Sequence, residues 1–342
     1  AKEVCKAVMA ASKEAQAPLR DRDVIAVSES VVARTQGNYA TLEQIAADVR
    51  AKIPAGADGK RTAAVVFPIM SRNRFSMLLK GISMGVDKLY IVLKYPSDEV
   101  GNELISLDRL EEKGVDPYRD VLTEAKYREL FGENVLHPFT GMDYVKLYRE
   151  YARNSEILLA NDARAVLPYA QDVIACDIHT RARTVRLLKE AGARTALTLA
   201  DLLNAPVDGS GYNPDFGLYG SNLATENSVK LFPRDCEKFV EKLAGMLRAE
   251  SGRQVEVMVY GDGAFKDPVG GIWELADPVV SPAYTEGLDG RPNEIKLKYL
   301  ADTQLRGESR EQAAEDAKKA IRAKAACLTG QMASQGTTPR RL

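Results

Sequence analysis

The fold class of this chain is decided by one stretch: Ala64-Val65-Val66-Phe67, followed by Phe75 to Met84 and then by Lys88-Leu89-Tyr90-Ile91-Val92-Leu93. Short apolar runs bounded by polar residues are typical of buried strands, and the longer segment between them predicts a helix. The apolar runs 157–160 and 173–176 repeat the pattern. Strands that alternate with helices predict a parallel sheet covered on both faces.

The sequence on either side of this segment predicts scattered strands and helices. Val24-Ile25-Ala26-Val27 and residues 255–260 are short apolar runs of the kind that form buried strands. Helices are predicted over three further ranges: 41–53, 235–250 and 308–327. In the first of them, Thr41 and Gln44 have the spacing of a capping box. The whole chain is therefore expected to have an α+β (mixed α/β) fold.

Composition and charge exclude several classes of protein. The chain has 342 residues with 47 basic and 48 acidic side chains, a balance that argues against a general nucleic-acid binder. Its four cysteines lie far apart without CxxC spacing, which predicts neither a zinc site nor a disulfide framework and fits a reducing cytoplasm. We expect no membrane span, because the sequence has no run of 18 apolar residues. It begins at Ala1 without methionine, which leaves a preceding segment open.

Asp262 stands between Gly261 and Gly263, directly after the strand predicted at 255–260. A carboxylate at the carboxyl end of a buried strand, flanked by glycines, can approach a cation or a phosphate closely. Mg²⁺ takes one or two carboxylates together with phosphate oxygens and water. The alternative is a plain turn, because Gly-Asp-Gly is a common turn sequence.

Two further segments have the composition of ligand-binding loops. In the stretch 217–223, small residues surround the polar Asn222, which suits a loop that binds an oxygen-rich ligand. Ser28, Ser30 and Arg34 follow the first predicted strand, where hydroxyl groups and a guanidinium can hold a phosphate. An ordinary loop and helix capping by the serines are the respective alternatives.

The predicted parallel sheet has polar loops after its strands. Ser71-Arg72-Asn73-Arg74 lies between a strand and a helix, where two arginines around an asparagine can grip a phosphate or a carboxylate. Residues 161–164 and 177–181 also follow strands, so three loops are expected to converge at one edge of the sheet. His179 is a candidate site residue, whereas His137 is expected to be structural. Solvated loops are the alternative.

Several of these stretches together resemble the coenzyme F420-0:glutamate ligase family. Residues 21–37 are similar to the family's strand, its nucleotide-contacting hydroxyl pair, its basic residue and its glycine. Residues 217–223 and the following Leu231-Phe232-Pro233 are similar to its G-I-D-x-S-N and L-P-P segments, and 255–265 resembles its strand ending in a metal-binding Asp. Shorter likenesses occur at 288–291 and 299–302. The resemblance covers roughly 20–60 and 214–304.

The resemblance implies roles for individual residues. Asp262 falls on a metal ligand, Asn222 on a nucleotide-contacting Asn and Ser30 on a hydroxyl position, while Arg34 replaces a Lys. Tyr219 stands where the family has its other metal-binding Asp, and Gly263 replaces a hydroxyl residue. The candidate substitute for the missing carboxylate is Asp215, for which a turn after Pro214 is the alternative. The family's glycine-rich nucleotide loop has no recognisable counterpart at 303–308.

The resemblance also implies an architecture and a reaction. We expect a ligase-like core of residues 1–62 and 214–330, an inserted α/β domain of 63–213 and a disordered tail of 331–342. The family couples GTP hydrolysis to the attachment of glutamate to a phospholactyl-flavin acceptor with divalent metal ions, and forms homodimers. We therefore expect a cytoplasmic, homodimeric ligase that uses GTP (or ATP) with Mg or Mn to form a glutamyl-type amide on a small-molecule carboxylate.

Two other functions remain open from the sequence. One is a non-catalytic relative that binds a nucleotide or another small molecule, which the substitution at Tyr219 favours. The other is a sugar-phosphate or nucleotide enzyme that acts through the α/β segment and depends on Arg72, Arg74 and His179. The P-loop, G-x-S-x-G, HExxH and dinucleotide-binding GxGxxG motifs do not occur in the sequence.

Overall fold

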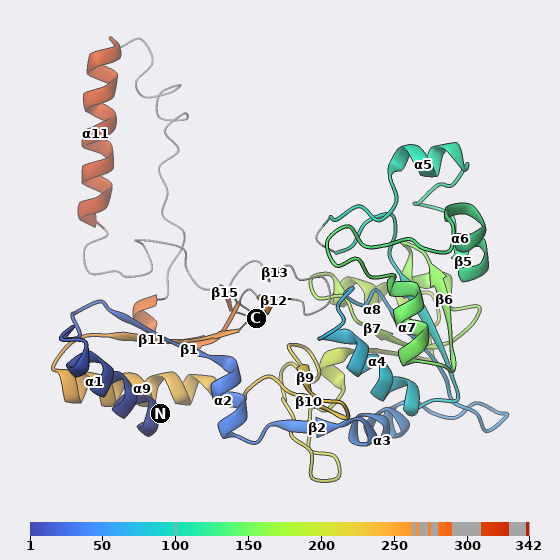
Figure 1. The fold of residues 1–342 in the computed structure, drawn as a ribbon, viewed down its shortest axis with the longest axis horizontal. Helices are drawn as coiled ribbons and strands as arrows, with labels where there is room; N and C mark the ends of the chain where they lie inside the picture. The colour runs from blue at the N-terminus through green and yellow to red at the C-terminus, as the bar shows by residue number, and fades with distance from the viewer. Residues whose placement is uncertain are drawn as a thin grey trace. The chain divides into compact units, whose positions relative to one another are not determined.

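The structure is a computed structural model that describes residues 1–99, 101–261, 265–266, 273–274, 280–288, 309–327 and 340–341. The chain forms two compact units. Unit 1 consists of Ala1–Glu29, Asp235–Gly263 and Ala276–Leu342, and unit 2 of Ser30–Arg234 and Ala264–Leu275. Helices and mixed sheets give the α+β class that the sequence predicts (Figure 1).

Unit 1 is built on a four-stranded sheet in the order β1 (Val24–Ser28), β11 (Glu256–Gly261), β14 (Val280–Tyr284) and β15 (Arg340–Arg341). β1 runs parallel to β11, and Ser28 lies opposite Tyr260. Helix α9 (Cys236–Ser251) packs against β11 and β14, because its apolar side buries Leu243 and Leu247. Helix α1 (Lys2–Glu14) packs in turn on α9.

Unit 2 contains the parallel sheet that the sequence predicts. Its strand order is β5 (Leu122–Thr123), β6 (Ser155–Leu159), β4 (Lys88–Leu93), β3 (Thr62–Val66), β7 (Asp172–Ala175) and β8 (Thr195–Thr198). All neighbours are parallel except β5, which pairs antiparallel with β6 at one edge. The predicted strand at 64–67 ends one residue early, because Phe67 has a positive φ of 58° and leaves the extended conformation.

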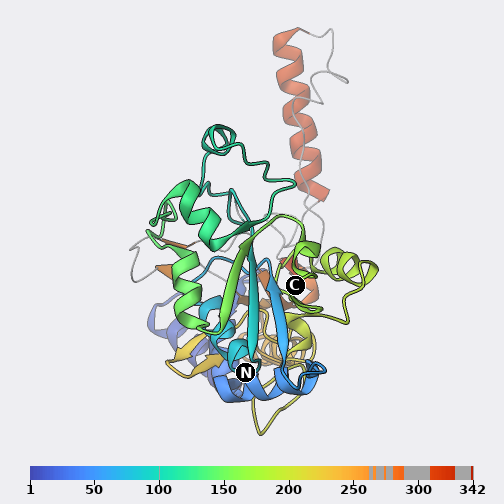
Figure 2. The ribbon, with the colours of Figure 1, turned by 90° about the vertical axis from the view of Figure 1, so that its right-hand side faces the viewer.

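Side chains of this sheet alternate between two buried cores. Val65, Ile91 and Ile174 belong to the core under α3 (Leu42–Lys52), α4 (Phe75–Met84) and α7 (Tyr144–Tyr151). Their neighbours Val66 and Val173 belong to the core under η1 (Ala163–Val166) and α8 (Arg181–Glu190). Figure 2 shows α7 and α8 on opposite sides of the sheet. Successive side chains along each strand are therefore buried on opposite faces of the sheet, as in parallel sheets covered by helices on both faces.

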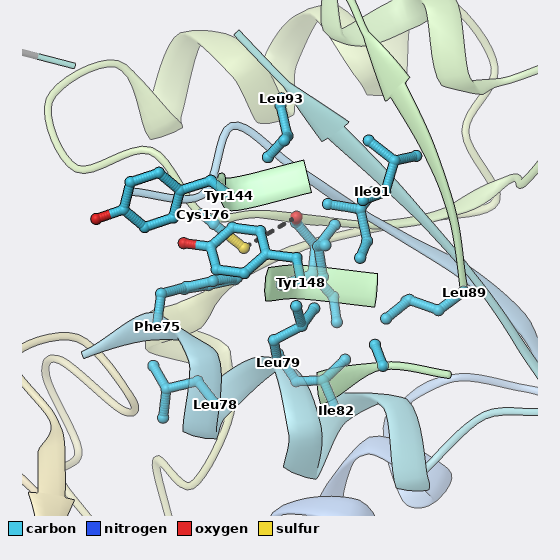
Figure 3. Close-up of a cluster of buried hydrophobic side chains, with 14 of the residues drawn as sticks. Phe75, Leu78, Leu79, Ile82, Leu89, Ile91, Leu93, Tyr144, Tyr148 and Cys176 are labelled. Atoms are coloured by element: carbon cyan, nitrogen blue, oxygen red, sulfur yellow. Dashed lines mark hydrogen bonds between the residues drawn. The ribbon is translucent and has the colours of Figure 1, made fainter. Parts of the chain in front are cut away.

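Aromatic and aliphatic side chains fill the larger of these cores (Figure 3). The rings of Phe75 on α4 and Tyr148 on α7 lie 5.7 Å apart, and both residues are buried. Cys176, directly after β7, lies in the same core. Because α7 carries a tyrosine into this core, its hydroxyl can reach the loop that follows β3.

Helix α3 joins the core of the 63–213 segment. The predicted capping box is present, since Gln44 N donates to Thr41 Oγ1 at 3.2 Å and Thr41 N donates to Gln44 Oε1 at 2.8 Å. Ile45 and Val49 of α3 pack against α4. The compact units therefore divide at 29/30 and 234/235, whereas we expected domain boundaries at 62/63 and 213/214. The apolar face of α3 must be buried, and it is buried against α4, which belongs to the 63–213 segment.

The remaining elements are short. In unit 2, β2 (Tyr39–Thr41), β10 (Ser228–Lys230) and β9 (Asn222–Thr225) form an antiparallel sheet in that order. The other elements are α2 (Glu29–Thr35), α5 (Leu107–Glu112), α6 (Glu124–Phe131), η2 (Leu199–Asp201), β12 (Phe265–Lys266), β13 (Trp273–Glu274), η3 (Glu286–Leu288) and α11 (Arg310–Cys327). In the expected tail of 331–342, only Arg340–Arg341 is described, as β15. No helix in the described part of the chain combines the length and apolar character of a bilayer crossing.

Candidate functional site

The parallel sheet of unit 2 changes direction between β3 and β7. The chain leaves β3 through α4 to reach β4 on one side, and leaves β7 through α8 to reach β8 on the other. Neighbouring parallel strands with diverging connections form a topological switch point, where open α/β sheets bind their ligands. Residues 71–74 follow β3 and residues 177–181 follow β7, so the structure brings these two predicted loops to the switch point.

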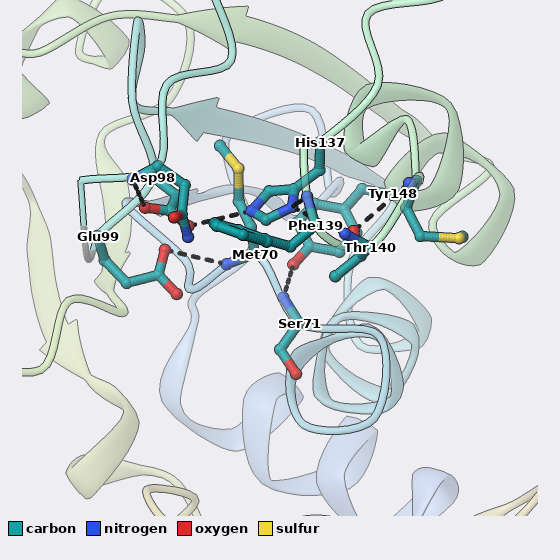
Figure 4. A network of polar contacts seen from close by, with 10 residues as sticks. Met70, Ser71, Asp98, Glu99, His137, Phe139, Thr140 and Tyr148 are labelled. Atoms are coloured by element: carbon teal, nitrogen blue, oxygen red, sulfur yellow. Dashed lines mark hydrogen bonds and ion pairs between the residues drawn. The ribbon is translucent and has the colours of Figure 1, made fainter. Parts of the chain in front are cut away.

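The loop after β3 is held by hydrogen bonds to a tyrosine of α7. Tyr148 Oη donates to the carbonyl oxygen of Ile69 at 2.5 Å and accepts from Ser71 N at 3.2 Å (Figure 4). Burial raises the pKa of Tyr148 well above its ordinary value, so its phenol stays neutral and keeps its proton for this bond. Ser71 Oγ accepts from Arg74 N at 3.3 Å. Ser71 is buried, and Arg72, Asn73 and Arg74 are half-buried, so the segment is an ordered part of the fold.

The loop after β7 contains a buried carboxylate. Asp177 is only 6% exposed, and its Oδ2 accepts from Thr180 Oγ1 at 2.5 Å and from Thr184 Oγ1 at 3.2 Å. Its other oxygen, Oδ1, is buried and has no hydrogen-bond partner among the residues that the structure describes. The candidate His179 is exposed at the outside of this loop. Thr180 and Thr184 belong to the start of α8, so Asp177 lies at the amino end of that helix.

A third segment, 219–223, is attached to both loops. Tyr219 Oη donates to the carbonyl oxygens of Asp177 at 3.0 Å and of Ala175 at 3.3 Å. The Arg181 guanidinium lies over the Tyr219 ring, 4.9 Å from its centre. Leu223 N donates to the carbonyl oxygen of Asn73 at 3.0 Å. Segments about 100 and 150 residues apart in the sequence therefore meet at one place.

The expected third βα loop, 161–164, has other contacts. Asn161 Nδ2 donates to the carbonyl oxygens of Tyr95 at 2.5 Å and of Pro117 at 2.9 Å. Asp162 pairs with Arg164, with Oδ2 and Nη2 2.6 Å apart. Asn161 therefore contacts the segment that follows β4. The segment 219–223, which no strand pattern connects to this sheet, occupies the third position at the switch point.

Tyr219, at the position where the resemblance implies a metal ligand, has a structural role. The residue is 9% exposed, and burial raises the pKa of its phenol, which stays neutral and acts as a donor. Its candidate substitute, Asp215, is exposed in a turn in which Asp215 N donates to Asn213 Oδ1 at 3.0 Å. No group of three metal-ligating side chains forms among the described residues. Asp262 and Gly263 lie outside the described residues.

The predicted nucleotide-binding residues occupy different elements. Ser28 is the last residue of β1 and lies beside Tyr260, the last residue but one of β11. The two parallel strands therefore end side by side. Ser30 and Arg34 lie on α2, where Arg34 is exposed in the last turn. Asn222 lies in unit 2, where it begins β9 opposite Lys230 and adjoins the segment at the switch point.

One buried polar network is not predicted by any pattern in the sequence. His137 Nε2 lies 3.1 Å from Asp98 Oδ2, and both side chains are 5% exposed. His137 Nδ1 accepts from the backbone N–H groups of Phe139 and Thr140 at 3.2 Å each, so its proton resides on Nε2 and is donated to Asp98. The network borders the loop after β3 (Figure 4). The structural role expected for His137 fits this arrangement, but no spacing in the sequence connects it to Asp98.

The model of the F420-0:Gamma-glutamyl ligase family matches residues 1–339. The match is wider than the two blocks in which the sequence resembles that family, and it spans the 63–213 segment. Comparisons with curated proteins and with solved structures give no match. Since the family model covers nearly the whole sequence, including both units, the chain belongs to the F420-0:gamma-glutamyl ligase family.

Proposed function

We propose that this protein is a nucleotide- and metal-dependent ligase that forms a glutamyl-type amide on a small-molecule carboxylate. Family membership over residues 1–339 is the observation that carries the proposal. In the reaction, the γ-phosphoryl group of GTP (or ATP) passes to the carboxylate and the nucleoside diphosphate leaves. An amine then attacks the acyl phosphate, forms the amide and expels inorganic phosphate. The substrates are thus a nucleotide, a carboxylate and an amino acid.

The parallel pair β1–β11 supports the location of the nucleotide site. Parallel strands that end side by side release their following residues at one edge, where phosphate and metal sites commonly form. Ser28 is the last residue of β1 and lies opposite Tyr260, two residues before Asp262. We propose that Ser28, Ser30 and Arg34 bind phosphate oxygens through hydroxyl groups and a guanidinium. Asn222 is proposed as a further nucleotide contact on the basis of the resemblance.

We propose from the resemblance that the reaction also needs Mg or Mn. Mg or Mn would neutralise charge on the transferring phosphoryl group. The described residues do not assemble a carboxylate pair for it, because Tyr219 stands at one ligand position and Asp215 is exposed in a turn. Asp262 and Asp215 remain the proposed ligands.

The state of Tyr219 favours a second candidate function. A neutral, buried phenol that donates to two carbonyl oxygens cannot take the place of a metal-bound carboxylate. A relative that binds the nucleotide or another small molecule without catalysis would keep the fold and tolerate this change. We propose this non-catalytic function as the alternative if the protein binds a nucleotide but does not turn it over. A homodimer and a cytoplasmic location complete the proposal from the resemblance.

Calorimetric titration of the full chain with GTP and with ATP, each with and without Mn²⁺ or Mg²⁺, tests the proposal. We expect metal-dependent binding that weakens at least about tenfold in Asp262→Ala and is unchanged in Asp108→Ala, which removes an exposed carboxylate of α5. Release of nucleoside diphosphate only in the presence of a carboxylate and glutamate identifies the ligase. Binding without such release identifies the non-catalytic relative, and a chain that binds neither nucleotide refutes both.

A further inference from the structure

We propose that unit 2 has a binding site for a small anionic ligand at the switch point between β3 and β7. The site consists of the half-buried Arg72 and Arg74, of Arg181, and of the buried Asp177 and Ser221. The arginines bind an oxyanion of the ligand, and Asp177 accepts from a hydroxyl or ammonium group next to it. All of these residues belong to unit 2, where Ser221 directly precedes Asn222, the proposed nucleotide contact. The contacts that define the site lie within unit 2 and do not depend on the proposed ligase reaction.

The first argument is that the three segments are held together by defined bonds. Asn73 accepts from Leu223 N at 3.0 Å, and Asp177 accepts from Tyr219 Oη at 3.0 Å through their backbone carbonyl oxygens. The loop that carries Arg72 and Arg74 is also hydrogen-bonded to Tyr148 of α7. Binding groups supported in this way lose little conformational entropy when a ligand arrives.

The second argument is the charge at the junction. Arg72, Arg74 and Arg181 contribute three guanidinium groups, and Asp177 contributes the only carboxylate of residues 71–74, 177–181 and 219–223. Arg181 is oriented by its place over the Tyr219 ring and by a bond from Nη1 to the carbonyl oxygen of Ile178. Planar, weakly hydrated guanidinium groups suit carboxylate and phosphate oxygens. The excess of positive charge therefore favours an anion.

The third argument comes from two buried polar atoms. Asp177 and Ser221 are 6% and 3% exposed, and neither Asp177 Oδ1 nor Ser221 Oγ has a hydrogen-bond partner within the described ranges. Most buried polar atoms in folded proteins have a partner, because losing water without replacement costs free energy. A ligand that donates to Asp177 Oδ1 and contacts Ser221 Oγ would restore these bonds. The ligand therefore carries a donor as well as an oxyanion.

The loop after β3 limits the kind of anion. Residues 67–74 contain no glycine, whereas loops that cradle a pyrophosphate with their backbone need glycine for the close approach. Recognition by arginine side chains instead suits a single carboxylate or phosphate group. An amino acid, with its carboxylate and ammonium groups, and a nucleoside monophosphate, with its phosphate and hydroxyl groups, both have this chemistry. The experiment must distinguish these two sources.

Titration calorimetry of the full chain with three probes provides the test. Sulfate is an oxyanion without a donor, L-glutamate has a carboxylate beside an ammonium group, and GMP has a phosphate with ribose hydroxyls. We expect glutamate or GMP to bind more tightly than sulfate. Arg74→Gln and Arg181→Gln should weaken binding of the preferred probe at least about tenfold, which corresponds to about 1.4 kcal/mol. Arg186→Gln on the exposed face of α8 is the matched control and should bind as the unaltered chain does.

Asp177→Asn separates the role of the buried carboxylate from that of the arginines. The change keeps the shape of the side chain, so glutamate or GMP binding should weaken while the weak binding of sulfate is retained. GMP can also occupy the proposed nucleotide site, so Ser30→Ala serves to distinguish the two sites. GMP binding that weakens in Ser30→Ala and is unchanged in the switch-point variants would place GMP at the nucleotide site and would not support this one. Circular dichroism confirms that each variant is folded. If no probe binds, or if all three switch-point variants bind like the unaltered chain, the proposal is wrong.

Discussion

The phenolic oxygen of Tyr219 donates a hydrogen bond to the carbonyl oxygen of Asp177 at 3.0 Å. This bond joins the segment that resembles a ligase motif to the loop after β7 of the parallel sheet. At the position where the resemblance implies a metal ligand, the side chain thus positions a neighbouring loop. The same loop carries Arg181, whose guanidinium lies over the Tyr219 ring. The tyrosine at position 219 therefore offers no carboxylate to a metal, and it packs against Arg181 and the loop after β7 instead.

Tyr219→Phe should destabilise the fold, because it removes the bonds to Asp177 and Ala175 and leaves the ring contacts in place. The single phenolic proton is shared between these two carbonyl oxygens, and a hydrogen bond contributes about 1 kcal/mol, so the free energy of unfolding should fall by about 1 kcal/mol. Urea unfolding followed by circular dichroism measures the change. Tyr118→Phe, at a residue that is 88% exposed, is the control and should have no effect.

Gly85→Ala should destabilise the contact between α3 and α4. A Cβ atom at Gly85 would lie 2.7 Å from Cβ of Val49 and 3.0 Å from the carbonyl oxygen of Ala46, so one helix must move. Overpacking of this kind costs about 1–3 kcal/mol. Gly245→Ala in α9 meets no atom within 4 Å and should instead stabilise by about 0.5–1 kcal/mol. Thermal unfolding that shifts in the same direction for both variants would contradict the packing.

Arg128→Ala should weaken the anchor of the loop after β3. Arg128 makes two bonds to Asp143, at 2.6 and 2.9 Å, and Asp143 caps α7 by accepting from Lys146 N. Both partners are largely buried, and removing one leaves the other without compensation, which costs about 3 kcal/mol. Arg119→Ala, at an exposed pair, should change the free energy of unfolding by less than about 0.5 kcal/mol.

The same variant should also change the switch point, because α7 carries Tyr148 to the loop of residues 69–71. Amide hydrogen exchange in this loop should become faster in Arg128→Ala than in Arg119→Ala at the same fraction folded. Equal exchange in the two variants would show that α7 does not support the loop.

Tyr95 should make stability decrease at alkaline pH. Burial raises the pKa of Tyr95 from 10.0 to about 12, and its hydroxyl donates to the carbonyl oxygen of Asp120 at 2.8 Å. Between these values the unfolded chain ionises at this position and the folded chain does not. The contribution is therefore complete below about pH 10 and is lost as the pH rises toward 12.

The measurement is the free energy of unfolding of the unaltered chain and of Tyr95→Phe between pH 9 and 11.5. The difference between them should shrink with rising pH, with a slope of at most about 1.4 kcal/mol per pH unit from one group. Tyr118→Phe should give a constant difference from the unaltered chain. A constant difference for Tyr95→Phe as well would show that the phenol ionises equally in both states.

Local patterns in the sequence predict the elements of this fold because they depend on nearby residues. The apolar runs from Ala64 onward form parallel strands, Phe75 to Met84 forms α4, and the capping box starts α3. The family resemblance is recognisable for the same reason, since its motifs are continuous stretches. The family match confirms it over a wider range than these motifs cover.

The sequence by itself therefore determined the class of the fold, the parallel sheet and the family. Only the tertiary structure decided which segments share a core and which polar groups meet. It placed α3 on α4, joined Asp98 to His137, and brought 219–223 to the loops after β3 and β7. These contacts join residues that are distant in the chain, and they arise from the packing of whole faces. No local period or spacing in the sequence predicts contacts between residues so far apart in the chain.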